Sequence, residues 1–201
     1  MTESVSYGNG ITLIYGPMFS GKTTKLIHIY NDICSSNGAD KCLALNYALD
    51  KRYGLDKIVT HDGKSIKCHA IESIDDIIND TKMQNLIIKS QYIFINEAQF
   101  FKGIDKLILF FTQKLKKHVI LCGLDLDFRC DKFGVMMDLL PYATTVYKLT
   151  GKCNTPECIY PSEYSHRIVS DDSQILIGSS EYIPLCKNCY KIENVAKLLI
   201  H

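Results

Sequence analysis

The stretch ITLIYGPMFSGKTTKLIHIY, residues 11–30, decides the fold class of this chain. Its first five residues form an apolar run of strand length, and Leu26, Ile29 and Tyr30 then recur at helical spacing. Between them, residues 16–24 read GPMFSGKTT, which fits the pattern G-x-x-x-x-G-K-[ST]. The pattern requires a strand before it and a helix after it, and both are present. We therefore interpret residues 16–24 as a phosphate-binding loop.

This loop offers several groups that bind the phosphates of ATP. Backbone N–H groups between about Phe19 and Thr23 would surround the phosphates, and the helix N-terminus adds a partial positive charge. Lys22 would neutralise the β- and γ-phosphates, and the Thr23 hydroxyl would bind Mg²⁺. The alternative is a chance match in an ordinary strand–helix turn. The expected ATP-binding residues are Gly16, Pro17, Met18, Phe19, Ser20, Gly21, Lys22, Thr23 and Thr24.

Four further apolar runs resemble the first one, at residues 41–46, 92–96, 118–122 and 145–149. They are interpreted as strands that are buried on both faces, as parallel strands are. Helical patterns lie between them. Ser73 begins a helix that is expected to run into the 80s, and another apolar stripe follows the run at 92–96. That stripe is formed by Ile104, Leu107, Ile108 and Phe111. Strands that alternate with helices predict an α/β domain with a mostly parallel sheet over residues 1–149.

A protein with a phosphate-binding loop usually carries a second strand that ends in an acidic residue near the metal. The run YIFINEAQFF, residues 92–101, is the candidate, because Glu97 lies just past the strand end. Glu97 could take a proton from water, as in an ATPase, or from a substrate hydroxyl, as in a kinase. The alternative is an exposed carboxylate at the start of a loop. The residues alone leave ATPase and kinase open.

The chain has nine cysteines, a high and odd number for 201 residues. Cys153 and Cys158 are separated by four residues, and Cys186 and Cys189 by two. Two such pairs predict a structural zinc site with four thiolates, and the 27 residues between the pairs predict an extra loop. The alternative is four free thiols. The remaining cysteines are expected to be buried as small hydrophobic residues: Cys34, Cys42, Cys68, Cys122 and Cys130.

The overall composition is that of an ordinary globular protein, with 46% hydrophobic and 22% charged residues. A net charge of +1 without a basic run argues against electrostatic binding of nucleic acid. No apolar run reaches the roughly 18 residues that span a bilayer, and the N-terminus lacks the pattern of a signal peptide. We therefore expect a soluble cytoplasmic protein without a nucleic-acid or membrane partner. After residue 149 the sequence becomes rich in Cys, Pro, Ser and Tyr and has no long apolar run. This change in composition predicts a small second domain at 150–192 and a C-terminal tail at 193–201.

Five segments, in this order, resemble the zinc-containing thymidine kinases, a family of cytosolic animal, bacterial and viral enzymes. The segments are GPMFSGKTT, LDKRYGLDKIVTHDG (49–63), NEAQFF (96–101), GLDLDFRCDKFG (123–134), and ILIGSSEYIPLCKNCY (175–190) with the cysteine pairs. The resemblance implies a RecA-like P-loop domain and a zinc ribbon whose lasso loop covers about residues 165–182. It implies transfer of the γ-phosphate of ATP to the 5′-hydroxyl of thymidine, which gives dTMP.

The resemblance also implies roles for individual residues. Glu97 would be the general base, and Lys22 and Arg52 would act on the transferred phosphate. The residues implied near Mg²⁺ are Thr23, Asn96 and Asp50. The residues implied around the nucleoside are Met18, Phe100, Leu124, Phe128, Phe133, Ser165, Gly178 and Tyr182. The family further suggests a homotetramer and feedback inhibition by thymidine triphosphate (dTTP).

Three positions depart from the family pattern. The first cysteine pair is usually two residues apart and is four apart here. Asn46 stands where a lysine is often seen, and Asn96 stands where the family has an aspartate. Asn96 leaves open a catalytically weakened or inactive nucleotide-binding homologue. A nucleic-acid-stimulated ATPase with a zinc ribbon is a further alternative, which the near-neutral charge disfavours.

Overall fold

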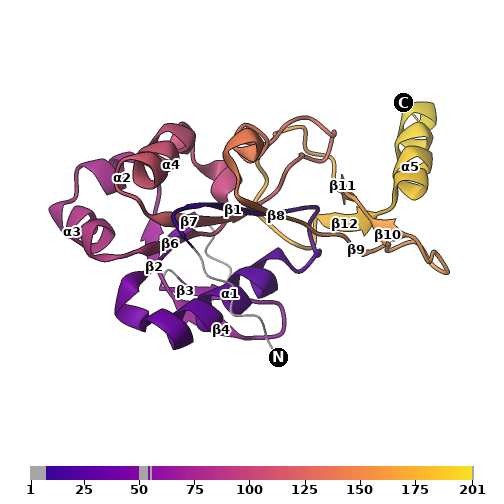
Figure 1. The fold of residues 1–201 in the computed structure, drawn as a ribbon. Coiled ribbons are helices and arrows are strands. Elements are labelled where there is room, and N and C mark those ends of the chain that lie inside the picture. Colours follow the sequence, from indigo (N-terminus) through magenta and orange to yellow (C-terminus); the bar gives the residue numbers. More distant parts are fainter. Residues whose placement is uncertain (1–7, 50–53, 55, 201) are drawn as a thin grey trace.

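The computed structural model describes residues 8–49, 54 and 56–200. Its centre is a six-stranded sheet with the order β5-β2-β6-β7-β1-β8, and every neighbouring pair is parallel (Figure 1). The strands are β1 (Gly10–Tyr15), β2 (Cys42–Tyr47), β5 (His69–Ile71), β6 (Tyr92–Ile95), β7 (His118–Gly123) and β8 (Thr145–Lys148). The predicted parallel α/β sheet is confirmed, and β5 is a short strand that the apolar runs did not indicate.

Helices cover both faces of this sheet (Figure 1). One face carries α2 (Asp75–Ile78), α3 (Thr81–Lys89) and α4 (Ile104–Gln113). The other carries α1 (Lys22–Asn37) and the hairpin of β3 (Lys57–Val59) and β4 (Ser65–Lys67). Short 3₁₀ helices are η1 (Ala39–Lys41), η2 (Ala98–Phe100) and η3 (Leu140–Tyr142).

The strands are apolar throughout because each face has its own core. In β6, Ile93 and Ile95 belong to the core beneath α2, α3 and α4, whereas Phe94 belongs to the core beneath α1. All three side chains are fully buried. Alternate residues of one strand therefore supply two separate cores, and no residue of the strand is left for solvent.

Three details differ from the sequence-based expectations. Strand β8 lies at the sheet edge, so its burial alternates and Val146 is 43% exposed instead of buried. The helix expected from Ser73 into the 80s ends at Ile78, and Asp80 then caps a new helix by accepting from the backbone of Lys82 at 2.8 Å. Five cysteines were expected to be buried, and only Cys122 among them is fully buried. The other four are half-buried: Cys34, Cys42, Cys68 and Cys130.

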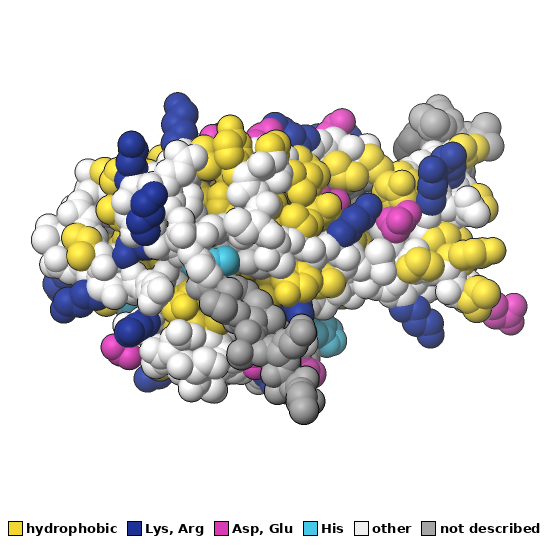
Figure 2. All heavy atoms as spheres, viewed as in Figure 1, with side chains coloured by type: hydrophobic (Ala, Val, Ile, Leu, Met, Phe, Trp, Pro, Cys, Tyr) yellow, Lys and Arg dark blue, Asp and Glu magenta, His cyan; other side chains and the backbone are white. Residues whose placement is uncertain are grey.

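The remaining elements extend beyond β8 as a separate small part (Figure 1). It contains the hairpins β9 (Gly151–Lys152) with β10 (Pro161–Ser162) and β11 (Tyr164–Arg167) with β12 (Tyr182–Leu185), followed by α5 (Lys187–Ile200). Hydrophobic side chains are exposed on this part (Figure 2), where Ile159 is 90% exposed. Among the described residues, no helix has both the length and the hydropathy to span a bilayer.

Candidate active site

One cavity collects most of the predicted site residues. It lies past the ends of β1, β6 and β7, and the hairpin of β11 and β12 supplies its far wall. The predicted residues in its lining are Met18, Phe19, Ser20, Gly21, Lys22, Thr23, Thr24, Asn96, Glu97, Phe100, Leu124, Phe128, Phe133, Ser165, Gly178 and Tyr182. Gly16 and Pro17 are in the same loop but outside the lining. Asp50 and Arg52 lie outside the described residues.

The loop at 16–24 has the geometry of a phosphate cradle. Gly16 has a φ of 147°, and a Cβ there would collide with the carbonyl oxygen of Leu149, so only glycine fits. Gly21, with a φ of 79°, turns the chain into α1, which begins at Lys22. The Lys22 Nζ donates to the carbonyl oxygen of Pro17 at 2.6 Å. The lysine is therefore already folded over the loop, where an arriving phosphate would meet its charge.

Glu97 is held in a fixed position at the end of β6. Its backbone is left-handed, with φ 56° and ψ 41°, which costs a non-glycine residue roughly 1–2 kcal/mol. Gln99 donates from Nε2 to Glu97 Oε2 at 2.6 Å, and Gln99 Oε1 accepts from the backbone N–H of Leu124 at 3.1 Å. Because a backbone N–H can only donate, the oxygen of Gln99 must face Leu124, and its NH₂ must face the carboxylate.

Two glycines make room for Gln99. A Cβ on Gly123 would lie 2.5 Å from Gln99 Oε1, and a Cβ on Gly134 would collide with the Gln99 backbone. Gly134 also has a φ of 62°, which favours glycine. Glycines in β7 and in the segment after it thus leave the space that Gln99 occupies beside Glu97.

Asn96 and Asn46, two departures from the family pattern, are in contact. Both are 4% exposed, and Asn96 Nδ2 donates to Asn46 Oδ1 at 2.9 Å. The other end of the Asn96 amide, Oδ1, is buried and has no hydrogen-bond partner among the described residues. Both side chains line the cavity beside the phosphate loop. Asn46 therefore fixes the Asn96 amide so that an acceptor oxygen is left for a ligand of the cavity.

Aromatic rings form another part of the cavity wall. Phe100 stacks on Tyr47 with ring centroids 4.8 Å apart and meets the edge of Phe133 at 5.5 Å. The Ser165 hydroxyl accepts from the backbone N–H of Met18 at 2.9 Å, which joins the phosphate loop to the β11–β12 hairpin. An aromatic pocket and a phosphate cradle therefore share one cavity, with Glu97 in its lining.

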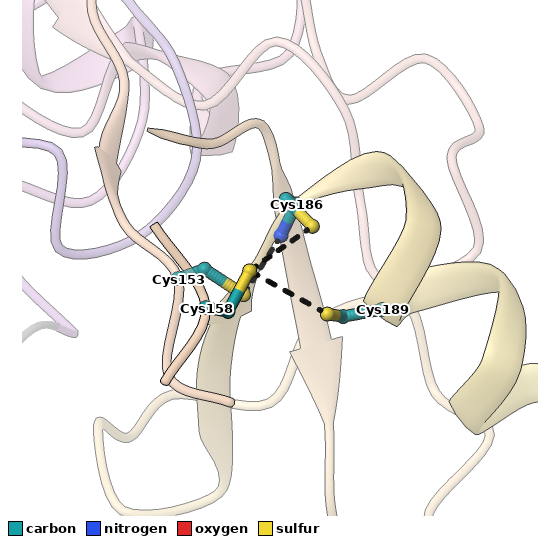
Figure 3. Close-up of side chains that lie close together, drawn as sticks. All are labelled: Cys153, Cys158, Cys186 and Cys189. Atoms are coloured by element: carbon teal, nitrogen blue, oxygen red, sulfur yellow. Dashed lines mark hydrogen bonds between the residues drawn. The ribbon is translucent and has the colours of Figure 1, made fainter. Parts of the chain in front are cut away.

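The side chains of the four paired cysteines converge (Figure 3), with Cys153 and Cys158 in the segment between β9 and β10 and Cys189 in the first turn of α5. Their Sγ atoms all lie within 4.8 Å of one another, and Cys158 Sγ lies 3.8 Å from the Sγ atoms of both Cys186 and Cys189. Four sulfur atoms about 2.3 Å from a tetrahedral zinc ion would be about 3.8 Å apart. The predicted set Cys153, Cys158, Cys186 and Cys189 is thus brought together in a geometry that fits zinc.

Thiol chemistry points in the same direction. Burial raises the pKa of Cys153, but backbone N–H groups of Cys186 and Thr155 outweigh it and bring the pKa to about 6. The backbone of Tyr160 lowers the pKa of Cys158, yet desolvation and hydrogen bonds from the other three cysteines raise it to about 12. The neighbouring thiols therefore oppose one another's ionisation. A divalent cation would allow all four to ionise.

Cys122 lies close to the phosphate loop, but its thiol is unreactive. Burial raises the pKa of its thiol to about 12, while the nearby Lys22 acts to lower it and Glu97 to raise it. A thiol that stays protonated is a poor nucleophile. Glu97, in contrast, lines the cavity and is oriented by its hydrogen bond from Gln99.

Comparison with known proteins gives the family. A family model described as "Thymidine kinase" matches residues 9–190. The chain belongs to the thymidine kinase family. The thymidine kinase of Pseudothermotoga lettingae is 36% identical over 185 residues, which are 90% of this chain and 94% of the relative. That of Yaba monkey tumor virus is 36% identical over 92% of this chain and 96% of the relative. That of Oryza sativa subsp. japonica is 33% identical over 94% of this chain and 69% of the relative.

Several residues of this thymidine kinase family member enter the site without having been predicted. Gln99 and His61 lie inside segments that carry the family resemblance, but nothing in the pattern separated them from their neighbours. Asn46 stands at the end of β2, where an α/β sheet places its site residues. Gln174 comes from the loop between β11 and β12, whose sequence gives no local signal. The cavity lining includes all four.

Proposed function

We propose that this chain phosphorylates thymidine at its 5′-hydroxyl with the γ-phosphate of ATP, a salvage reaction that gives dTMP. The observation that carries the proposal is the shared cavity, whose lining includes a phosphate cradle, the Glu97 carboxylate and an aromatic pocket. An ATPase needs the first two and has no use for the third. The family and its relatives support the same reaction.

On the phosphate side, the loop at 16–24 would bind the β- and γ-phosphates. Lys22 would exchange the Pro17 carbonyl for phosphate oxygens and neutralise charge that develops during transfer. Mg²⁺ bound with ATP would supply positive charge that stabilises the phosphates during transfer. The Thr23 hydroxyl and the buried Asn96 Oδ1 offer it, or its waters, uncharged oxygen acceptors. Asp50 and Arg52 complete this side in the proposal.

On the nucleoside side, Glu97 would accept the proton of the 5′-hydroxyl as that oxygen attacks the γ-phosphate. Gln99 donates to Glu97 Oε2 and so helps to orient the carboxylate for this proton transfer. A general base positioned within hydrogen-bond distance of its substrate raises the reaction rate by about 10²–10⁴-fold. The left-handed backbone of Glu97 fits this role, because strain of this kind gathers where a side chain must be aimed.

The aromatic pocket would hold the thymine ring. A flat pyrimidine stacks on rings such as Phe100 and Phe128, and backbone groups of the lasso loop would bind its polar edge. A snug apolar pocket rewards the 5-methyl group by only about 1–3 kcal/mol. We therefore expect thymidine to be preferred over deoxyuridine by a modest factor.

We propose that Zn²⁺ binds the four cysteines and anchors both ends of the lasso. The link to the nucleoside pocket is short, because Tyr190, next to Cys189, donates from its hydroxyl to the carbonyl oxygen of Phe128 at 2.6 Å. Zinc supplies structural cross-linking here and no catalysis, since four thiolates leave no open position. The family resemblance also supports a cytoplasmic homotetramer with dTTP as a feedback inhibitor, and we propose these as finer expectations.

The proposal is tested by measuring ADP release from ATP with no addition, with thymidine, and with single-stranded DNA. We expect release that depends on thymidine and is unchanged by DNA. Equal release without any nucleoside would identify an ATPase and overturn the proposal. No release under any condition, with ATP and thymidine both bound, would identify an inactive homologue.

A further inference from the structure

Arg167 is among the largest fully buried side chains of the described residues, with 1% of its surface exposed. It is the last residue of β11, where the loop at 168–181 begins. Its guanidinium NH1 donates to the carbonyl oxygens of Asp171 and Ser173, both at 2.6 Å, and NH2 donates to that of Gln174 at 3.3 Å. One planar group thus holds three backbone positions of the loop that follows it.

The same guanidinium is fixed against the wall of the nucleoside pocket. It lies over the Phe128 ring at 3.7 Å from the centroid, and it donates to the Tyr182 hydroxyl from Nε at 3.1 Å and from NH2 at 2.5 Å. The Tyr182 hydroxyl in turn donates to the carbonyl oxygen of Leu176 at 3.1 Å. Phe128, Tyr182, Gln174 and Leu176 line the cavity, whereas Arg167 does not.

The loop is only partly packed against the rest of the protein: Ile168, Val169 and Ile175 are 51%, 40% and 44% exposed, whereas Leu176 and Ile177 are partly buried. Apart from the Arg167 contacts, Gln174 Nε2 donates to Asp127 Oδ2 at 2.9 Å. Burying an arginine is costly, and the Asp171 carboxylate, 3.7 Å away, is itself 40% exposed. An apolar residue would fill the space at lower cost but would hold none of the carbonyls. The arrangement favours a role in fixing the loop over a role in stability alone.

We propose that Arg167 is a positioning residue for the nucleoside: it fixes the loop at 168–181 in its binding shape before thymidine arrives. The inference rests on the proposed function, since it concerns the thymidine side of the same cavity. The phosphate loop is built from β1 and α1, and its hydrogen bond to β11 is made by Ser165 and not by Arg167, so we expect ATP binding to be independent of Arg167. Loss of Arg167 is therefore selective, and it weakens thymidine binding without weakening ATP binding.

Arg129 is a matched control. It contacts the same loop through NH1, which donates to the carbonyl oxygen of Asp172 at 3.1 Å, and it lies over the same Phe128 ring at 4.9 Å. Its side chain is 45% exposed, so its contacts are open to solvent. Removing Arg129 deletes an arginine that contacts the loop while keeping the buried guanidinium of Arg167.

The experiment compares Arg167→Ala, Arg167→Lys and Arg129→Ala with the wild type. Dissociation constants for thymidine and for ATP are measured separately by calorimetry, and kcat and KM by steady-state assay. If the freed loop holds its binding shape only about 1–10% of the time, thymidine affinity falls by about 10–100-fold. We expect that loss in Arg167→Ala, with ATP affinity and kcat at saturation within threefold of the wild type and little change in Arg129→Ala.

Arg167→Lys keeps the charge but lacks the planar fork that reaches several acceptors, so we expect an intermediate affinity. Hydrogen exchange of residues 168–181 gives a second readout: faster exchange without thymidine in the Arg167 variants, and recovery when thymidine saturates them. If the alanine variant does not fold, the lysine variant decides. Wild-type thymidine affinity in either Arg167 variant, or an equal loss of ATP affinity, would overturn the inference. A wild type that binds no thymidine would instead overturn the proposed function.

Discussion

Substitution of Gln99 by leucine is expected to slow phosphoryl transfer while leaving both substrates bound. Gln99 Nε2 donates to Glu97 Oε2 at 2.6 Å, and Gln99 Oε1 accepts from Leu124 N–H, so both polar ends of its side chain serve the protein. Leucine is close in size and removes both bonds. Glu97 then loses a hydrogen bond that helps to fix its orientation, and its carboxylate is held less firmly in line with the 5′-hydroxyl.

The structure sets the size of the effect. A hydrogen bond to a charged group contributes about 1.5–3 kcal/mol. At about 1.4 kcal/mol for each tenfold in rate, its loss lowers kcat by roughly 10–150-fold. The partly buried N–H of Leu124 also loses its acceptor, which costs stability by about 1–3 kcal/mol at most. The variant is therefore expected to remain folded and to melt at a somewhat lower temperature.

The assay is a rapid-quench measurement of thymidine phosphorylation at saturating ATP and thymidine, combined with calorimetric affinities for each substrate. Gln113→Leu is the control, because Gln113 ends α4 and is exposed. Gln99→Glu sharpens the test, since it keeps an acceptor for Leu124 but offers no N–H to Glu97 and adds a like charge. It should be at least as slow as the leucine variant. A Gln99→Leu enzyme with more than half of the wild-type kcat would refute the reasoning.

Three further predictions follow from the same geometry. Glu97→Gln should lower kcat by about 10²–10⁴-fold with both substrates still bound in calorimetry; a variant above half of the wild-type rate would remove Glu97 from the mechanism. Cys186→Ser should lose the metal in elemental analysis. It should also weaken thymidine binding more than ATP binding, because the proposed zinc site anchors both ends of the lasso loop. Zinc-free wild type, or unchanged thymidine affinity in the variant, would count against this. Asn96→Asp should lower the Mg²⁺ concentration for half-maximal activity by about one or two decades and raise kcat, since a charge-assisted bond is stronger than a neutral one. Identical Mg²⁺ titrations for Asn96→Asp and wild type would make Asn96 a neutral replacement.

The sequence predicted those features that local chemistry dictates. The strand, loop and helix around Gly16 and Lys22 follow from a pattern that fixes the backbone, and the apolar runs indicated five strands of the sheet. The spacing of the four cysteines predicted that their side chains would meet, and their Sγ atoms lie within 4.8 Å of one another. The eight residues implied around the nucleoside all line one cavity, which could be expected from the family resemblance but not from periodicity.

Contacts between distant segments could not be predicted in the same way. The hydrogen bond between Asn46 and Asn96 depends on β2 lying beside β6. The hydrophobic pattern of a strand does not show which strand lies next to it. Gln99 reads as an ordinary polar residue until Leu124 is found opposite it. Arg167 reads as a surface arginine, because nothing nearby in the chain shows that its own loop folds back over it.

Label transfer tests the central claim most directly. The wild-type protein is incubated with γ-³²P-labelled ATP, Mg²⁺ and thymidine, and the products are separated and counted. We predict that the label appears on thymidine as the 5′-monophosphate, in proportion to the ADP formed, and that Glu97→Gln forms almost none. Label released only as inorganic phosphate, at a rate that thymidine does not change, would contradict the account.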